Sequence, residues 1–162
     1  MPAGRLGGTP TGGGLSFALG LSLRGGAVFG DARAFPFDRF WMGGVQFGEN
    51  LRGYGETSVT PLGYFPERGG GISDIERLGD AFFSLTAEYA VRMGNQLGLS
   101  LFYDAGSVWR EPGDFDPSSL YRGAGIGAQV VTPFGPIGID YAYGFDKDVP
   151  GWQLHFRMGP GY

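Results

Sequence analysis

The sequence contains no cysteine, a single histidine (His155) and few charged residues, which make up 17% of its 162 positions. Without cysteine the chain forms no disulfide, which suits folding outside the cytoplasm. The sequence also lacks any apolar run that approaches the roughly 18 residues of a membrane-spanning helix. Its net charge of −4 argues against nucleic acid as a partner, because nucleic-acid binding requires a basic surface.

Motifs for covalent chemistry are also missing from the sequence. It shows no nucleotide-binding loop, no cluster of metal ligands and no pair of nucleophile and base. His155 has no plausible catalytic partner nearby in the sequence, so we interpret it as an ordinary polar residue of a strand. We therefore expect no enzymatic activity, no cofactor and no metal.

Glycine is abundant instead, with 33 residues, and 15% of the chain is aromatic. Glycine at this level weakens helices. Apolar residues alternate with small or polar ones, as in Leu15, Phe17 and Leu19 against Ser16 and Ala18, which is the period of a half-buried strand. Six segments show this pattern: 15–24, 81–93, 96–109, 122–132, 137–145 and 152–162.

The alternation predicts two different faces for the sheet that these strands form. The face that we call inner carries the charged residues, and the face that we call outer is apolar. The inner face includes Arg24, Glu88, Arg92, Asp104, Asp140, His155 and Arg157, and the outer face includes Leu85, Leu101, Tyr141 and Phe156. A soluble β-sandwich also alternates in this way, so the pattern leaves that alternative open.

The connections between the strands favour a membrane. Short turns at 94–95 and 133–136 alternate with longer loops at 31–79, 110–121 and 146–151. Outer-membrane barrels have short periplasmic turns and longer external loops. Aromatic residues at strand ends also fit interfacial girdles: Tyr103, Trp109, Tyr121, Phe134, Phe145, Trp152 and Tyr162. We predict an all-β fold, an antiparallel transmembrane β-barrel.

Two charged residues predict where the long loop lies. Arg52 belongs to the 31–79 loop, whereas Asp104 interrupts an apolar strand. An unpaired charge that is removed from water costs several kcal/mol. If the loop folds back into a barrel, the two side chains can meet there.

Four motifs in this order resemble the BamA-type outer-membrane insertase superfamily. The stretch 35–44 followed by Leu51-Arg52-Gly53-Tyr54 resembles its long external loop, with leucine where the family motif has valine. Phe102-Tyr103-Asp104-Ala105-Gly106 resembles its strand motif, in which Phe102 and Gly106 flank the acid. The hairpin 129–136 and the ending 156–162 resemble its last strands. The resemblance covers about 14–162.

The resemblance implies a sixteen-stranded barrel in the bacterial outer membrane, of which 15–162 hold the C-terminal six strands. The stretch 1–14 is rich in glycine and proline, and we expect it to form a flexible start. The resemblance also implies that Arg52 reaches the acids Glu88 and Asp104 and holds the loop inside, while Gly53 permits its tight backbone. We call Arg52, Gly53, Tyr54, Glu88 and Asp104 the loop lock. The implied partners are membrane lipid, unfolded outer-membrane client proteins, the remaining barrel strands and periplasmic POTRA modules.

A second site is expected at the last strand, where a barrel closes. Glycine packs little and proline donates no ladder hydrogen bond, so Gly151, Gly159, Pro160 and Gly161 predict weak pairing there, next to the terminal aromatic Tyr162. By resemblance this lateral seam is where client barrels insert. Two other roles share these motifs: a two-partner secretion transporter, and a barrel that anchors a patatin-type lipase.

Overall fold

A computed structural model describes residues 6–7, 14–30, 38–66 and 71–159. Seven antiparallel strands form one sheet in the order β1-β2-β5-β6-β7-β8-β9. All six predicted strands are present: β2 (Leu15–Ala27), β5 (Ala81–Met93), β6 (Leu97–Trp109), β7 (Tyr121–Thr132), β8 (Gly135–Gly144) and β9 (Gly151–Met158). The two-residue β1 (Leu6–Gly7) pairs with β2.

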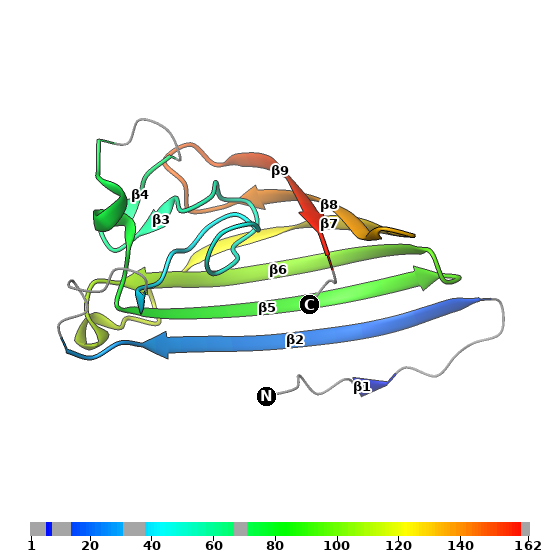
Figure 1. Cartoon of the computed structure of the whole chain (residues 1–162), viewed down its shortest axis with the longest axis horizontal. Helices are drawn as coiled ribbons and strands as arrows, with labels where there is room; N and C mark the ends of the chain where they lie inside the picture. The colour runs from blue at the N-terminus through cyan, green and yellow to red at the C-terminus, as the bar shows by residue number, and fades with distance from the viewer. Residues whose placement is uncertain (1–5, 8–13, 31–37, 67–70, 160–162) are drawn as a thin grey trace.

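The sheet curves into a trough, and the segment from 38 onward lies on the inside of the curve (Figure 1). This loop contains a small two-stranded sheet, β3 (Val59–Thr60) with β4 (Gly63–Tyr64), and the short 3-10 helix η3 (Asp74–Arg77). A second 3-10 helix, η4 (Pro112–Asp114), follows β6. No helix in the described part of the chain is long and apolar enough to cross a membrane.

Strand register confirms the two predicted faces. Glu88 pairs with Phe102, Thr86 with Asp104, and Asp140 with His155. Residues that pair across an antiparallel ladder point to the same face, so the charged residues share the inner face. The outer face is apolar and exposed along all six long strands; Leu19, Leu101 and Ile126, for example, keep 55–59% of their surface.

The buried core lies between the loop and the inner face of the sheet, rather than between two sheets. Met42, Leu51, Tyr54 and Val59 of the loop pack against Phe82 and Val108 of the strands. The predicted folding of the 31–79 loop onto the inner face is therefore confirmed for its described residues, while 31–37 and 67–70 lie outside them. The sheet leaves one apolar face without a covering layer among the described residues.

Three expectations about the strand ends differ from the structure. Pro136, predicted in a turn, is the second residue of β8 and pairs with Val131. Tyr121 packs edge-on against Tyr54 on the inner face instead of joining a girdle. Trp109 is covered by Phe115 of the following loop, since an aromatic at a strand end can be buried by its own connection.

Among the described residues β9 is hydrogen-bonded only to β8, and β1 only to β2, so the sheet is open at both edges. The predicted closure into a sixteen-stranded barrel stays a prediction. Pro160, Gly161 and Tyr162 of the expected seam lie outside the described residues.

Candidate functional site

Two buried arginines that the sequence interpretation did not single out connect distant segments of the loop with one another. Arg39 forms an ion pair with Asp80 and donates to the carbonyl of Leu78 at 2.9 Å. Arg77 of η3 donates to the carbonyls of Thr57 and Phe65 at 3.1 and 3.2 Å. Buried carbonyls need such donors, because a loop has no ladder to satisfy them.

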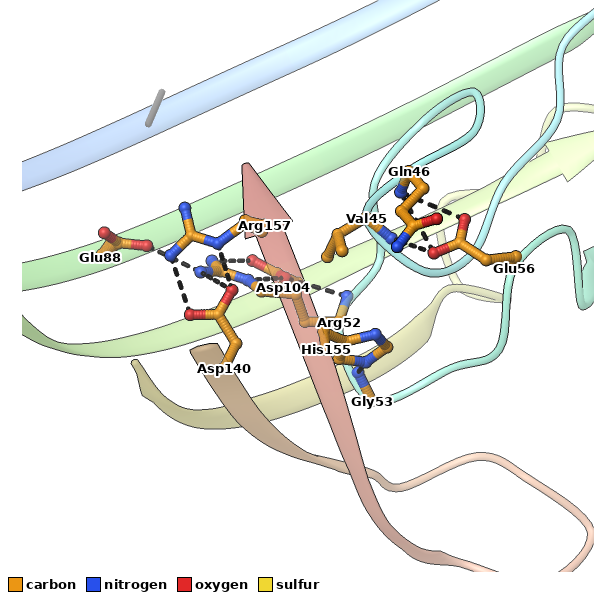
Figure 2. Close-up of polar contacts among 10 residues, drawn as sticks. All are labelled: Val45, Gln46, Arg52, Gly53, Glu56, Glu88, Asp104, Asp140, His155 and Arg157. Carbon is orange, nitrogen blue, oxygen red and sulfur yellow. Dashed lines mark hydrogen bonds and ion pairs between the residues drawn. The ribbon is translucent and has the colours of Figure 1, made fainter. Parts of the chain in front are cut away.

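A carboxylate organises the middle of the loop. Glu56 accepts hydrogen bonds from the backbone N–H groups of Val45 at 2.7 Å and Gln46 at 3.1 Å (Figure 2). It also accepts one from the N–H of Phe47 at 3.1 Å. Successive N–H groups that converge in this way form an anion-binding concavity. Gly44 has a positive φ of 70°, and a Cβ there would lie 2.0 Å from the carboxylate of Glu56, so a larger residue would displace this carboxylate from its position.

The loop lock contains the ion pairs that we expected between Arg52 and the two acids. Arg52 Nε and Nη2 donate to the two carboxylate oxygens of Asp104 at 2.7 and 2.9 Å, and its Nη1 donates to Glu88 at 2.8 Å (Figure 2). The side chains of Arg52 and Asp104 are each only 2% exposed. This bidentate geometry is the strong form of an arginine–carboxylate pair.

Burial alone lowers the pKa of the Arg52 guanidinium. The hydrogen bonds and charges of Asp104 and Glu88 outweigh that effect and raise this pKa above its ordinary value. Arg52 is therefore a permanent cation, and its position depends on the acids that surround it.

A second arginine and a third acid extend the network towards the last strand. Arg157 of β9 donates from Nη2 to Asp140 of β8 at 2.9 Å, and Arg52 Nη1 lies 3.9 Å from the same carboxylate (Figure 2). Asp140 is fully buried. Three acids and two arginines thus face one another across β5, β6, β8, β9 and the loop. In the described part of the chain, no three His, Cys, Asp or Glu side chains are placed so that they could hold a metal ion together.

The strand motif that flanks Asp104 has a physical role on each side. The guanidinium carbon of Arg52 lies 3.4 Å from the centre of the Phe102 ring, which forms a cation–π contact beneath the ion pair. A Cβ at Gly106 would lie 3.0 Å from the sulfur of Met42 and 2.9 Å from a strand carbonyl. Gly106 thus permits the loop to pack closely on β6.

The tip of the loop lies directly on the strands β7 and β8. Gly53 has a φ of +92°, and a Cβ there would lie 2.9 Å from the nitrogen of Gly144. A Cβ at Gly123 would lie 2.1 Å from the carbonyl oxygen of Arg52, and one at Gly144 2.4 Å from that of Gly53. These strand glycines are required by the close approach of the loop backbone.

Tyr54 and His155 complete the attachment of the tip. The hydroxyl of Tyr54 donates to the carbonyl of Arg122 at 2.8 Å and accepts from the N–H of Asp146 at 3.1 Å. The N–H of Gly53 donates to Nε2 of His155 at 2.9 Å. His155 is polar and lies on the inner face, as interpreted from the sequence, but its contact with the loop was not foreseen.

The described part of the expected seam is limited to two glycines. Gly151 opens β9 opposite Gly144, and Gly159 follows the strand with a φ of +115°. The N–H of Gly159 still donates to the carbonyl of Pro136 at 3.0 Å. Neither glycine takes part in the hydrogen bonds and ion pairs given above for the loop lock.

These features can be compared with known proteins. A model of the Omp85 superfamily domain matches residues 9–161. The chain belongs to the Omp85 superfamily. Members of the Omp85 superfamily are outer-membrane β-barrels that insert or secrete proteins, and the antiparallel all-β sheet of this chain agrees with that fold. The resemblance inferred from four motifs is thereby confirmed at the level of the superfamily.

Proposed function

We propose that this chain is the C-terminal part of a sixteen-stranded outer-membrane barrel that folds and inserts client outer-membrane proteins, as BamA-type members of the Omp85 superfamily do. It acts by binding and by strand pairing, without covalent chemistry, cofactor or metal. Its partners are membrane lipid, unfolded client proteins, the remaining barrel strands and POTRA modules.

One observation carries this proposal: the polarity of the sheet is inverted relative to that of a soluble protein. The outer face exposes rows of Leu, Ile, Phe and Tyr, whereas the charges of the network lie buried on the inner face. A soluble β-sandwich packs its apolar face against a second sheet. Exposed apolar surface on this scale instead marks contact with lipid or with another protein.

The position of the loop favours insertion over secretion. The loop packs on the inner face through its core residues and through Arg52, Gly53 and Tyr54. A secretion transporter must pass its substrate through the interior, so it would have to displace this loop first. An insertase that works at a lateral seam can keep the loop in place.

At the seam, β9 is the strand that offers backbone groups to a client. The edge of β9 that faces away from β8 has no hydrogen-bonded partner among the described residues. An extended segment can add to such an edge by β-augmentation, in which main-chain hydrogen bonds give the affinity. Weak pairing at Gly151 and Gly159 would ease the exchange of one partner strand for another.

The test is a client-folding assay. The assembled protein is reconstituted in liposomes, and a client barrel of eight strands is added after unfolding in urea. Folding of the client is followed by its electrophoretic mobility in samples that are not heated before the gel is run. We expect faster client folding than in empty liposomes, and loss of that acceleration in Arg52→Ala. Arg92→Ala, which removes an exposed arginine from the same face, is the matched control.

The outcomes separate the alternatives. Export of a single chain into the liposome lumen without accelerated barrel folding would identify a secretion transporter. Phospholipid hydrolysis by the assembled protein would identify a lipase for which this barrel is an anchor. Either result would replace the insertase proposal.

A further inference from the structure

The three residues at the tip of the loop attach it to different parts of the sheet. Arg52 binds acids on β5 and β6, and the hydroxyl of Tyr54 binds a carbonyl of β7. Gly53, between them, binds the last strand through His155. Among the contacts of the tip that the structure describes, this is the hydrogen bond that reaches β9.

The geometry of that hydrogen bond defines the state of the imidazole. The backbone N–H of Gly53 is the donor, so Nε2 of His155 must present its lone pair. The ring is therefore neutral and carries its proton on Nδ1, because the hydrogen bond of one ring nitrogen fixes the tautomer. His155 is 5% exposed, so water competes poorly for the same nitrogen.

The backbone around Gly53 leaves little freedom to form this contact in another way. The tip crosses β8 so closely that a Cβ at Gly53 would lie 3.0 Å from the carbonyl oxygen of Tyr143. From this position the N–H of Gly53 reaches across β8 to the inner face of β9, where His155 is held opposite Asp140 by the strand register. Figure 2 shows the imidazole of His155 beside Gly53, next to the Arg52 network.

We propose that His155 is a positioning residue that couples the last strand to the loop tip, with the neutral Nδ1–H imidazole as the acceptor. A loop that leaves the inner face must release β9, and a β9 that moves outward must release the loop. The structural coupling stands on the geometry alone. Its consequence for client insertion rests on the proposed function, in which β9 is the seam strand.

The first test reads the imidazole itself by nitrogen-15 NMR. The assembled protein in detergent micelles is labelled with 15N at histidine, and the signals of His155 are identified as those missing from His155→Phe. At pH 7 we expect the Nδ1–H tautomer, with Nε2 unprotonated. The Nε2–H tautomer, which predominates in free histidine, or a doubly protonated ring would overturn the proposal.

The second test measures the coupling by amide hydrogen exchange of Gly53 and of β9. His155→Phe keeps the ring volume and removes the acceptor, so Gly53 should exchange about threefold to tenfold faster, the range expected for loss of one ordinary hydrogen bond. The β9 amides should also exchange faster. Gln153→Leu, on the same face of β9, is the control and should leave both rates within about twofold.

Equal effects of the two variants, or no effect of His155→Phe on Gly53, would show that the contact does not couple the strand to the loop. If His155→Phe does not fold, the tautomer in the unmodified protein still decides, with His155→Gln identifying the signals. Neither readout involves a client protein, so the coupling and the proposed function can fail separately.

Discussion

At the scale of single residues, Arg52 is the centre of the site because it is the buried cation on which acids from two strands converge. Its three nitrogens donate at 2.7–2.9 Å to Asp104 and Glu88. Removing one partner of a buried pair leaves the other charge without compensation, which costs about 3–5 kcal/mol. The loop lock should therefore respond to substitution as one cooperative unit.

A double-mutant cycle tests this cooperativity. We expect Arg52→Ala to lower the free energy of unfolding by a few kcal/mol, since it leaves two acids unpaired, and Asp104→Asn to have a smaller effect. The two changes should be non-additive by roughly 1–3 kcal/mol, as measured by urea unfolding in micelles. Additive effects would mean that the two side chains do not depend on each other.

A pH-dependent contact lies at the edge of the site. The side-chain hydrogen bonds from Arg122 hold the pKa of Asp146 below its ordinary value, although partial burial opposes this. A lowered folded-state pKa means that the contact stabilises the fold above about pH 4 and is lost as the pH falls through the lowered value. The effect is small, because the Arg122 side chain is 53% exposed.

We therefore expect the free energy of unfolding to fall less steeply between pH 5 and pH 2 in Asp146→Asn than in the unmodified protein. Chemical unfolding in micelles at several pH values measures the free energy of unfolding of both proteins. The titration of the other carboxylates is common to both and cancels in the difference between them. Parallel pH profiles for the two proteins would contradict the assignment.

At the scale of elements, the sequence predicts the strands well because alternation and turn signals are local. The bounds of β5 agree with the predicted 81–93, and those of β6 and β7 differ by one residue. Pro136 was misplaced because proline was interpreted as a turn residue, whereas the second position of β8 tolerates it. Local pattern cannot indicate which aromatic, such as Tyr121, a distant loop will cover.

The interior of the loop could not be predicted in the same way. The contacts of Glu56, Arg39 and Arg77 depend on how the loop folds back, which no periodicity records. One signal was present in the sequence: Gly123, Gly125 and Gly127 fall on the inner face of one strand. A row of glycines on one face indicates close approach of another backbone or side chain.

The two faces of β6 give a prediction for neighbouring positions. Leu99 is exposed on the outer face, and Ser100 lies on the inner face between Ala90 and Gly127 of the neighbouring strands. Arginine at a lipid-facing position near mid-membrane costs about 2–4 kcal/mol. Unfolding measurements in lipid vesicles should show this loss for Leu99→Arg and a much smaller loss for Ser100→Arg. Equal tolerance of the two substitutions would show that the outer face does not contact lipid.

At the scale of the whole molecule, the sheet is a curved wall with an apolar outside and a loop bound to its inside (Figure 1). Both edges are open among the described residues, so the wall is suited to form part of a larger closed barrel. The ion-pair network and the loop core hold the inside together, and lipid is the proposed solvent of the outside. The same alternation of residues along the strands thus provides both the apolar surface proposed to contact lipid and the charged surface that binds the loop.

The central claim is that lipid contacts the outer face while the loop occupies the inner face. Because the chain has no cysteine, single nitroxide labels can be placed at 97–101 and 103 without other substitutions in it, which leaves the contacts of Arg52 intact. The measurement is the collision rate of each label with oxygen and with a water-soluble nickel complex in bilayers. We expect a period of two, with high oxygen access at Leu97, Leu99, Leu101 and Tyr103 and low oxygen access at Gly98 and Ser100, which lie on the inner face. Access without this period, or high nickel access at Leu99 and Leu101, would contradict the account.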